Sequence, residues 1–239
     1  MPSPARAAAV LTGILALLAA AGIASASASI PQGKPFSGVP YVGALVQDTA
    51  GVLGSHFCTA SVVNSPQGNL VITSAHCMAG RVPADVAFAP GYRNGPSPYG
   101  VYPVSGVFTD QAWTAGHSIN DDVAILELGS DVQAQTGALT LATGHSPATT
   151  KVIGYPDTAS RPVECAARAT WFRKNQQLRF VCGGYPDGTS GGPWIISKTQ
   201  VYGVIGGYQQ GGIKSWISYS PYFGGNIRAL YNQAVAQDS

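Results

Sequence analysis

The sequence has 239 residues, of which only 10% are charged, and its formal net charge is +2. Its 30 glycines and 17 prolines indicate frequent turns and argue against long helices. The small net charge and the lack of a long basic stripe disfavour a nucleic-acid-binding protein.

The first 28 residues have the pattern of a secretory signal peptide. Arg6 precedes an apolar run at 7–24 that is rich in Ala and Leu, and small residues follow it. Cleavage after Ala28 fits the small-x-small pattern, and cleavage after Ala26 fits the same pattern. The run is shorter than the roughly 20 apolar residues of a membrane span, which disfavours an anchor. We therefore expect an exported protein that has no membrane attachment after cleavage.

Short segments rich in Val, Ile, Tyr and Phe follow, separated by Gly, Pro, Asn and Asp, and each is predicted to form a β-strand. The first strands are predicted at 41–46, 57–63, 69–75, 82–89, 101–109 and 122–128. A polar stretch then precedes further strands at 151–155, 163–172, 178–182, 193–197, 200–208 and 215–220. Regularly spaced short strands predict an all-β fold of sandwiches or closed barrels.

One helix is predicted at the end of the chain. Asn226 is an acceptable N-cap, and apolar residues follow at the spacing of one helical face. These residues are Ile227, Leu230, Tyr231, Ala234 and Val235. We expect this face to pack onto the second half of the chain.

The four cysteines, an even number in an exported chain, predict two disulfides. Four cysteines can form two disulfides in three ways, and the sequence leaves all three open. Pairs Cys58–Cys77 and Cys165–Cys182 would close loops of similar, modest length, each contributing about 3 kcal/mol. A zinc site is disfavoured, because no C-x-x-C pair occurs and the spacings are too wide for finger or ribbon ligands. No metal is expected.

The segment GGYPDGTSGGPW at 183–194 contains the pattern G-x-S-x-G around Ser190. The pattern alone fits more than one class of serine hydrolase, or a flexible loop. In an α/β-hydrolase the catalytic histidine follows the serine, but every histidine of this chain precedes Ser190. The histidines are His56, His76, His117 and His145. This order excludes the usual lipase or esterase arrangement and permits the order His, Asp, Ser.

A serine nucleophile needs an imidazole to accept its proton and a carboxylate to orient that imidazole. His76 is the best candidate, since it ends the β-branched run VITSAHC beside a cysteine that could anchor the turn. The segment INDDVAILEL offers Asp121 and Asp122. Asp122 is favoured because it adjoins the apolar strand; the alternative is that both aspartates are turn residues.

Three segments in this order, SAHC, NDDVAIL and GTSGGP, resemble the signature segments of the chymotrypsin-like (trypsin-type) serine endopeptidases. HFCTASVV at 56–63 also resembles the family strand whose cysteine pairs with the one after the catalytic histidine. The resemblance runs from about residue 41 to the final helix, and the small secreted bacterial members are the most similar. It implies two six-stranded antiparallel β-barrels with a C-terminal helix. The expected bounds are 1–28 for the signal peptide, 29–40 for an N-terminal segment or short pro-segment, 41–130 and 131–225 for the barrels, and 226–239 for the helix.

The resemblance also implies roles for individual residues. His76 is expected to act as general base and then acid, Asp122 to orient it, and Ser190 to be the acylated nucleophile. The backbone amides of Gly188 and Ser190 would form the oxyanion hole, where a Cβ at residue 188 would crowd the substrate. We expect a secreted, monomeric endopeptidase that hydrolyses proteins or peptides through an acyl-enzyme, without a metal or organic cofactor.

Two positions depart from the pattern of animal members of the family. Thr189 stands where they have an aspartate that pairs with a newly cut N-terminus, and a neutral hydroxyl cannot form that ion pair. Gly184 stands where trypsin-type members have the acidic residue that selects Lys or Arg. Neither activation by N-terminal insertion nor a tryptic preference is therefore expected.

The expected pocket wall is the segment VIGGYQQGG. Gly206, Gly207 and Tyr208 match the family segment that pairs with the substrate backbone, and no histidine of the kind found in glutamate-specific relatives occurs there. Asp187 is interpreted as a turn residue, with a place in the cleft as the alternative. His56 is expected to be structural, and His117 and His145 to lie at the surface.

Two other functions compete with this interpretation. An esterase could use the same three residues, since ester and amide hydrolysis share the acyl-enzyme. A non-catalytic binding module on a degenerate protease fold predicts the loss of at least one of the three residues, and none is lost here.

Overall fold

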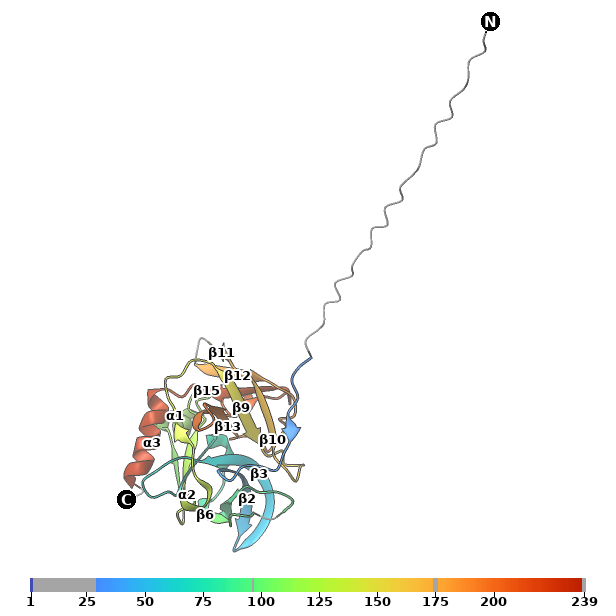
Figure 1. The fold of residues 1–239 in the computed structure, drawn as a ribbon. Helices are drawn as coiled ribbons and strands as arrows, with labels where there is room; N and C mark the ends of the chain where they lie inside the picture. The colour runs from blue at the N-terminus through green and yellow to red at the C-terminus, as the bar shows by residue number, and fades with distance from the viewer. Residues whose placement is uncertain (2–28, 96, 174–175, 238–239) are drawn as a thin grey trace.

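The protein is described by a computed structural model over residue 1 and residues 29–95, 97–173 and 176–237, and these residues form mainly β-strands (Figure 1). The predicted signal peptide lies almost wholly outside the described residues. Within them, no helix combines the length and the apolar character that a membrane crossing requires.

The first half of the chain forms a closed barrel of six antiparallel strands in the order β2-β3-β4-β7-β6-β5. Val, Ile, Leu and Phe side chains of these strands point inward and are fully buried, which explains why such segments form strands here. The strands are β2 (Val42–Thr49), β3 (Val52–Val62), β4 (Leu70–Thr73), β5 (Val86–Pro90), β6 (Tyr102–Thr109) and β7 (Ala124–Leu128).

The second half of the chain, joined by one short strand of the N-terminal segment, packs two sheets over one apolar core. One sheet has the order β1-β10-β9-β13-β14-β8 and the other β11-β12-β15. The fold class is thus confirmed as all-β, with hydrogen bonding in this half divided between the two sheets. The strands are β1 (Lys34–Pro35), β8 (Thr140–Leu141), β9 (Thr149–Gly154), β10 (Val163–Arg168), β11 (Thr170–Phe172), β12 (Gln177–Val181), β13 (Pro193–Ile196), β14 (Gln200–Val204) and β15 (Ile217–Pro221).

Every strand expected from the sequence occurs. One of them is divided into two strands, and two further short strands were not expected. The segment expected as one strand at 163–172 is two strands, because the buried Ala169 leaves the sheet and its amide donates to the carbonyl of Ala148. The two-residue strands β1 and β8 are too short to produce a sequence pattern.

Helices are few and mostly short. Asp110 caps α1 (Gln111–Gly116) by accepting a hydrogen bond from the amide of Ala112. The other elements are α2 (Gln133–Thr136), α3 (Gly225–Gln237) and the 3₁₀ turns η1 (Ala75–Met78), η2 (Pro83–Asp85) and η3 (Tyr208–Gly211).

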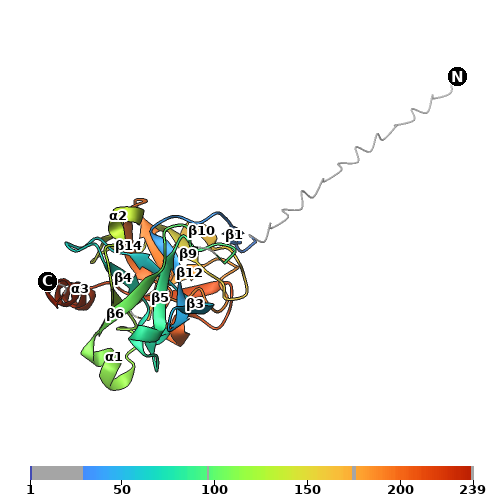
Figure 2. The same ribbon diagram turned by 90° about the horizontal axis from the view of Figure 1, so that it is seen from below.

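The terminal helix α3 occurs as predicted but packs elsewhere than expected. Most of its contacts are with β6 and β7 of the first barrel, and not with the second half as expected, although Arg228 also donates to the Leu141 carbonyl of β8. Figures 1 and 2 show α3 at the edge of the molecule, on the same side as β6. Asn226 is not its cap either. The helix begins at Gly225, and the Asn226 side-chain Nδ2 instead donates to Asp121 Oδ1 at 2.7 Å.

Two disulfides tie these elements together. Cys58 of β3 is bonded to Cys77 of η1, and Cys165 of β10 is bonded to Cys182 just after β12. The Cys58–Cys77 bond fixes the turn that carries His76 to the wall of the first barrel. The Cys165–Cys182 bond joins the two sheets of the second half, next to the segment that leads to Ser190.

Candidate active site

His76 and Asp122 are joined by two hydrogen bonds. The His76 backbone amide donates to Asp122 Oδ1 and the ring Nδ1 lies against Asp122 Oδ2, both at 2.8 Å. An ionised carboxylate can only accept, so Nδ1 carries the proton and Nε2 is left with a free lone pair. The arrangement therefore produces an imidazole whose other nitrogen, Nε2, can act as a base.

A third donor completes the surroundings of Asp122, which is fully buried. The amide of Gly207 donates to Asp122 Oδ2 at 2.7 Å. Burial of a carboxylate is costly unless donors replace water, and these three hydrogen bonds supply that replacement. Gly206 allows the approach, because a Cβ at that residue would lie 3.1 Å from the Asp122 carbonyl oxygen and from the Ser74 Cβ.

The neighbouring Asp121 has a different role. Its Oδ2 accepts from the Ser118 hydroxyl at 2.6 Å, and its Oδ1 accepts from the Asn226 amide of α3. Asp121 therefore fixes the turn before β7 to the terminal helix, while Asp122 alone faces His76.

The loop that carries Ser190 is held by Thr59 of β3, a buried residue that the sequence analysis did not single out. The Thr59 hydroxyl donates to the Gly188 carbonyl at 3.0 Å and accepts from the Tyr155 amide at 2.8 Å. The Thr59 amide donates to the Ser190 carbonyl at 2.7 Å. Because Thr59 and its partners lie far apart in the sequence, no local sequence pattern indicates these contacts.

The fold itself requires a glycine at residue 188, in addition to the expected crowding of a substrate. Its φ is +86°, and a Cβ there would lie 2.3 Å from the Asp157 amide nitrogen and 2.6 Å from the Tyr155 carbonyl oxygen. The clash that the structure shows is thus with the 155–157 backbone of the protein itself. Among the described residues, the amides of Gly188 and Ser190 make no backbone hydrogen bond, which leaves both free to donate to a ligand.

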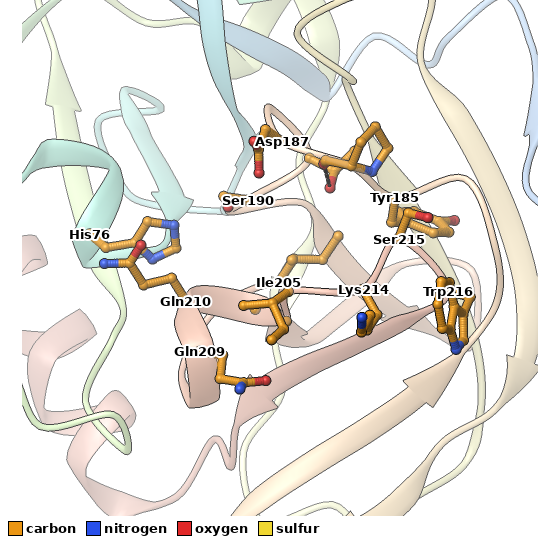
Figure 3. Close-up of a pocket in the computed structure, with 15 residues that line it drawn as sticks. His76, Tyr185, Asp187, Ser190, Ile205, Gln209, Gln210, Lys214, Ser215 and Trp216 are labelled. Atoms are coloured by element: carbon orange, nitrogen blue, oxygen red, sulfur yellow. Dashed lines mark hydrogen bonds between the residues drawn. The ribbon is translucent and has the colours of Figure 1, made fainter.

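A cleft of about 560 Å³ contains both His76 and Ser190. Figure 3 shows His76 on one side of Ser190, with Tyr185, Ser215 and Trp216 on the other. The exposed Asp187 also lines this cleft, as in the alternative interpretation of that residue. Gly184 does not line this cleft. Its φ is +93°, and a Cβ there would lie nearest to Gly33, at 3.7 Å.

The segment expected to pair with substrate is largely engaged within the protein. The amide of Gly206 donates to the Tyr219 carbonyl, that of Gly207 to Asp122, and that of Tyr208 to Gln177 Oε1. A substrate backbone would therefore have to pair with carbonyl oxygens here. The wall of the large cleft is formed farther along the chain, by residues 209–216.

Thr189 is almost fully buried, and its hydroxyl donates to the Pro186 carbonyl at 2.6 Å. The N-terminal segment lies elsewhere, along the outer edge of the second half. The Gly183 amide donates to the Pro31 carbonyl and the Gly33 amide donates to the Gly183 carbonyl, both at 2.7 Å. Within the described residues, the contacts that order the Ser190 loop include the neutral hydrogen bonds of Thr189 and Thr59.

The other histidines lie away from Ser190. The ring of His56 is buried and its Nε2 lies 2.8 Å from the Pro156 carbonyl oxygen. His117 ends α1 and packs against Trp113, and His145 is exposed. His76 lies close to the sulfurs of Cys58 and Cys77, but both are in a disulfide and are not available as thiolate ligands.

Comparison with known proteins finds a matching family model and solved structures with the same fold. The family model described as Trypsin matches residues 32–222. The protease Anisep from Arthrobacter nicotinovorans has a TM-score of 0.72 and 23% identity, over 85% of this chain and 99% of that one. The thermostable serine protease AL20 from an extremophilic microorganism has a TM-score of 0.70 and 25% identity, over 82% and 97%.

The fold is also shared with a protein named for binding. Human heparin binding protein has a TM-score of 0.67 and 15% identity, over 88% of this chain and 98% of that one. A comparison with curated protein sequences found no match.

A two-barrel β fold with an Asp-oriented histidine and a serine in one cleft defines the class of chymotrypsin-like serine hydrolases. The chain belongs to the trypsin family, and it is a serine-type endopeptidase whose substrates are proteins.

Proposed function

We propose that the protein is an exported endopeptidase that cleaves peptide bonds through an acyl-enzyme on Ser190. The observation that carries this proposal is the buried Asp122, whose two hydrogen bonds to His76 leave Nε2 as the base in the cleft that also contains Ser190. The fold alone would not support a catalytic function, because a protein named for heparin binding has the same fold.

The first half of the proposed reaction forms the acyl-enzyme. Ser190 Oγ attacks the carbonyl carbon of the scissile bond while its proton passes to His76 Nε2. The amides of Gly188 and Ser190 donate to the oxyanion of the tetrahedral intermediate. His76 then gives the proton to the leaving nitrogen, the C–N bond breaks, and the amine product departs.

The second half restores the enzyme. A water molecule attacks the acyl carbon and gives a proton to His76 Nε2, and collapse of the second intermediate returns that proton to Ser190 Oγ as the acid product leaves. Throughout, Asp122 stabilises the imidazolium. Side chains, backbone amides and water supply every atom and proton, so the mechanism needs no cofactor.

An extended cleft favours a polypeptide substrate over a simple ester. The large cleft lies on one side of Ser190, and a second hollow of about 260 Å³ begins at His76 and Ser190. A chain passing through both would be held on each side of the scissile bond, which is the positioning that amide hydrolysis requires.

Export and a monomeric state complete the proposal. The predicted signal peptide supports export, and so do two disulfides, which persist in oxidising compartments. Analytical ultracentrifugation of the secreted form would test the monomer.

Active-site labelling and substitution test the catalytic proposal. An aryl phosphonate should label Ser190 stoichiometrically, as read by peptide mapping, and Ser190→Ala should abolish peptide hydrolysis with an unchanged circular dichroism spectrum. Asp122→Asn should lower kcat by about 10⁴-fold, because the wrong imidazole tautomer is then favoured. Turnover retained by a folded Ser190→Ala protein would overturn the assignment.

A further inference from the structure

A second groove leaves Ser190 on the side opposite to residues 213–216. It runs past His76 and the Cys58–Cys77 disulfide to Arg81, and we call it the Arg81 groove. Asp187, Gly188 and Gln210 complete the part of its wall nearest Ser190. The groove shares four lining residues with the large cleft, so the two form one continuous channel. The shared residues are His76, Asp187, Ser190 and Gln210.

The chemistry assigns a direction to this channel. His76 must deliver a proton to the leaving nitrogen, so the chain that follows the scissile bond has to leave on the His76 side of Ser190. The acyl half of the substrate then occupies the large cleft opposite, lined by Tyr185, Ser215 and Trp216 (Figure 3). The Arg81 groove is thus the path of the leaving peptide.

The Arg81 side chain is held in place but its charge is not neutralised. Its Cζ lies 3.6 Å from the centroid of the Phe57 ring, a cation–π contact that favours a position of the guanidinium at the groove wall. In the described part of the chain, no carboxylate lies within salt-bridge distance of Arg81. A guanidinium that packs on an aromatic ring and has no carboxylate partner is suited to bind a carboxylate through paired hydrogen bonds.

We propose that Arg81 binds an acidic side chain of the leaving peptide, so that the enzyme prefers bonds followed by Asp or Glu. The inference rests on the proposed function of Ser190. Asp187 lines both cavities and so lies at their junction around Ser190, whereas Arg81 lines only the groove. The carboxylate of Asp187 would repel an acidic residue directly after the scissile bond. The preference therefore belongs to the second residue after that bond.

A set of matched peptides tests the preference. The bond cut in a peptide library is first located by mass spectrometry, and one such peptide is resynthesised with Glu, Gln or Lys as the second residue after that bond. We expect kcat/KM to be roughly three- to tenfold higher for Glu than for Gln, and lowest for Lys. The Glu-to-Gln ratio should fall towards one at about 1 M salt, because the site is exposed to solvent.

Variants separate a binding role from a merely structural one. Arg81→Gln should bring the Glu-to-Gln ratio to about one, and Arg81→Lys should keep part of it, since the charge remains without the planar fork. Lys198→Gln removes an equally exposed cation outside both cavities and should leave the ratio unchanged. A ratio near one in the wild type, or one unchanged by Arg81→Gln, would overturn the inference. Absence of any cleavage in the library would instead contradict the proposed function.

Discussion

Thr59 connects the two barrels at the back of the Ser190 loop. Its single hydroxyl bridges the Tyr155 amide and the Gly188 carbonyl, and its own amide holds the Ser190 carbonyl. The peptide groups on both sides of the loop are therefore fixed from the first barrel. Since an oxyanion hole works through amides that are oriented before the reaction, Thr59 is a positioning residue for the proposed chemistry.

Replacement of Thr59 by Val should lower both activity and stability. The isosteric change leaves a buried amide and a buried carbonyl without partners, at a cost of about 1–3 kcal/mol in the free energy of unfolding. We expect kcat to fall by about tenfold with little change in KM, less than the roughly 10²-fold loss for removal of an oxyanion donor itself. Steady-state kinetics with one peptide and urea denaturation measure the two effects.

The matched control is Thr59→Ser, which keeps the hydroxyl. It should retain near wild-type kcat, although the lost methyl group lowers stability. Equal kcat for the Val and Ser variants would show that the hydroxyl does not position the loop.

At the residue scale, the sequence identifies the residue types and the order that a reaction requires. It does not identify the contacts that the fold makes between residues far apart in the chain. The types and order of His76, Asp122 and Ser190 were sufficient to predict them as catalytic, and these remain predictions until the variants are measured. Thr59 could not be found, because it lies 129 residues from Gly188 and a threonine in a strand has no distinctive spacing. The engagement of Gly207 with Asp122 was equally hidden, since both groups belong to different barrels.

At the scale of elements, strand β1 is the least predictable and directly supports the site. Lys34 and Pro35 pair with Glu164 and Val163 of β10, and Pro31 and Gly33 hold both polar groups of Gly183. From Gly183 the chain continues through Tyr185 to Asp187 in the cleft wall. The N-terminal segment thus braces the start of the Ser190 loop from outside.

Removal of residues 29–33 should therefore impair catalysis more than overall folding. The truncation exposes the amide and carbonyl of Gly183 and removes two hydrogen bonds, each worth about 1 kcal/mol. We expect kcat/KM on a peptide to fall several-fold while the thermal midpoint drops by only a few degrees. Removal of residues 29–30 leaves those bonds intact and serves as the control. An equally active 34–239 protein would contradict a bracing role.

At this scale, sequence patterns predicted whether a segment is a helix or a strand better than they predicted which surface it packs against. The apolar face of α3 was legible from its spacing, but the surface that it covers depends on tertiary geometry. The sequence places α3 after the last strand of the second half, yet its buried face meets β6 and β7, and Asn226 reaches Asp121. A helical period indicates which side is buried and carries no information about the partner.

At the scale of the whole molecule, one apolar core extends across both barrels. It includes Val42 and Ile72 from the first barrel, Ile153 and Tyr155 from the second, and Ile227 of α3. Candidate site residues come from both halves, so this shared core fixes their relative positions. It also encloses a phenol group: the fully buried Tyr155 hydroxyl donates to the Val42 carbonyl at 3.3 Å.

Such buried phenols make stability sensitive to alkali. Burial raises the pKa of Tyr155 and of Tyr185 far above the ordinary value of 10.0, because the phenolate would be desolvated. Above about pH 10 the unfolded chain loses these protons while the folded chain keeps them, so the free energy of unfolding falls by up to about 1.4 kcal/mol per pH unit for each tyrosine. Below that pH the contribution is fully present.

Urea denaturation between about pH 9 and about pH 11 should show the decline, and Tyr155→Phe, which cannot ionise, should make it shallower by one tyrosine's share. An identical slope for the variant would mean that Tyr155 ionises alike in both states and is not shielded by the shared core.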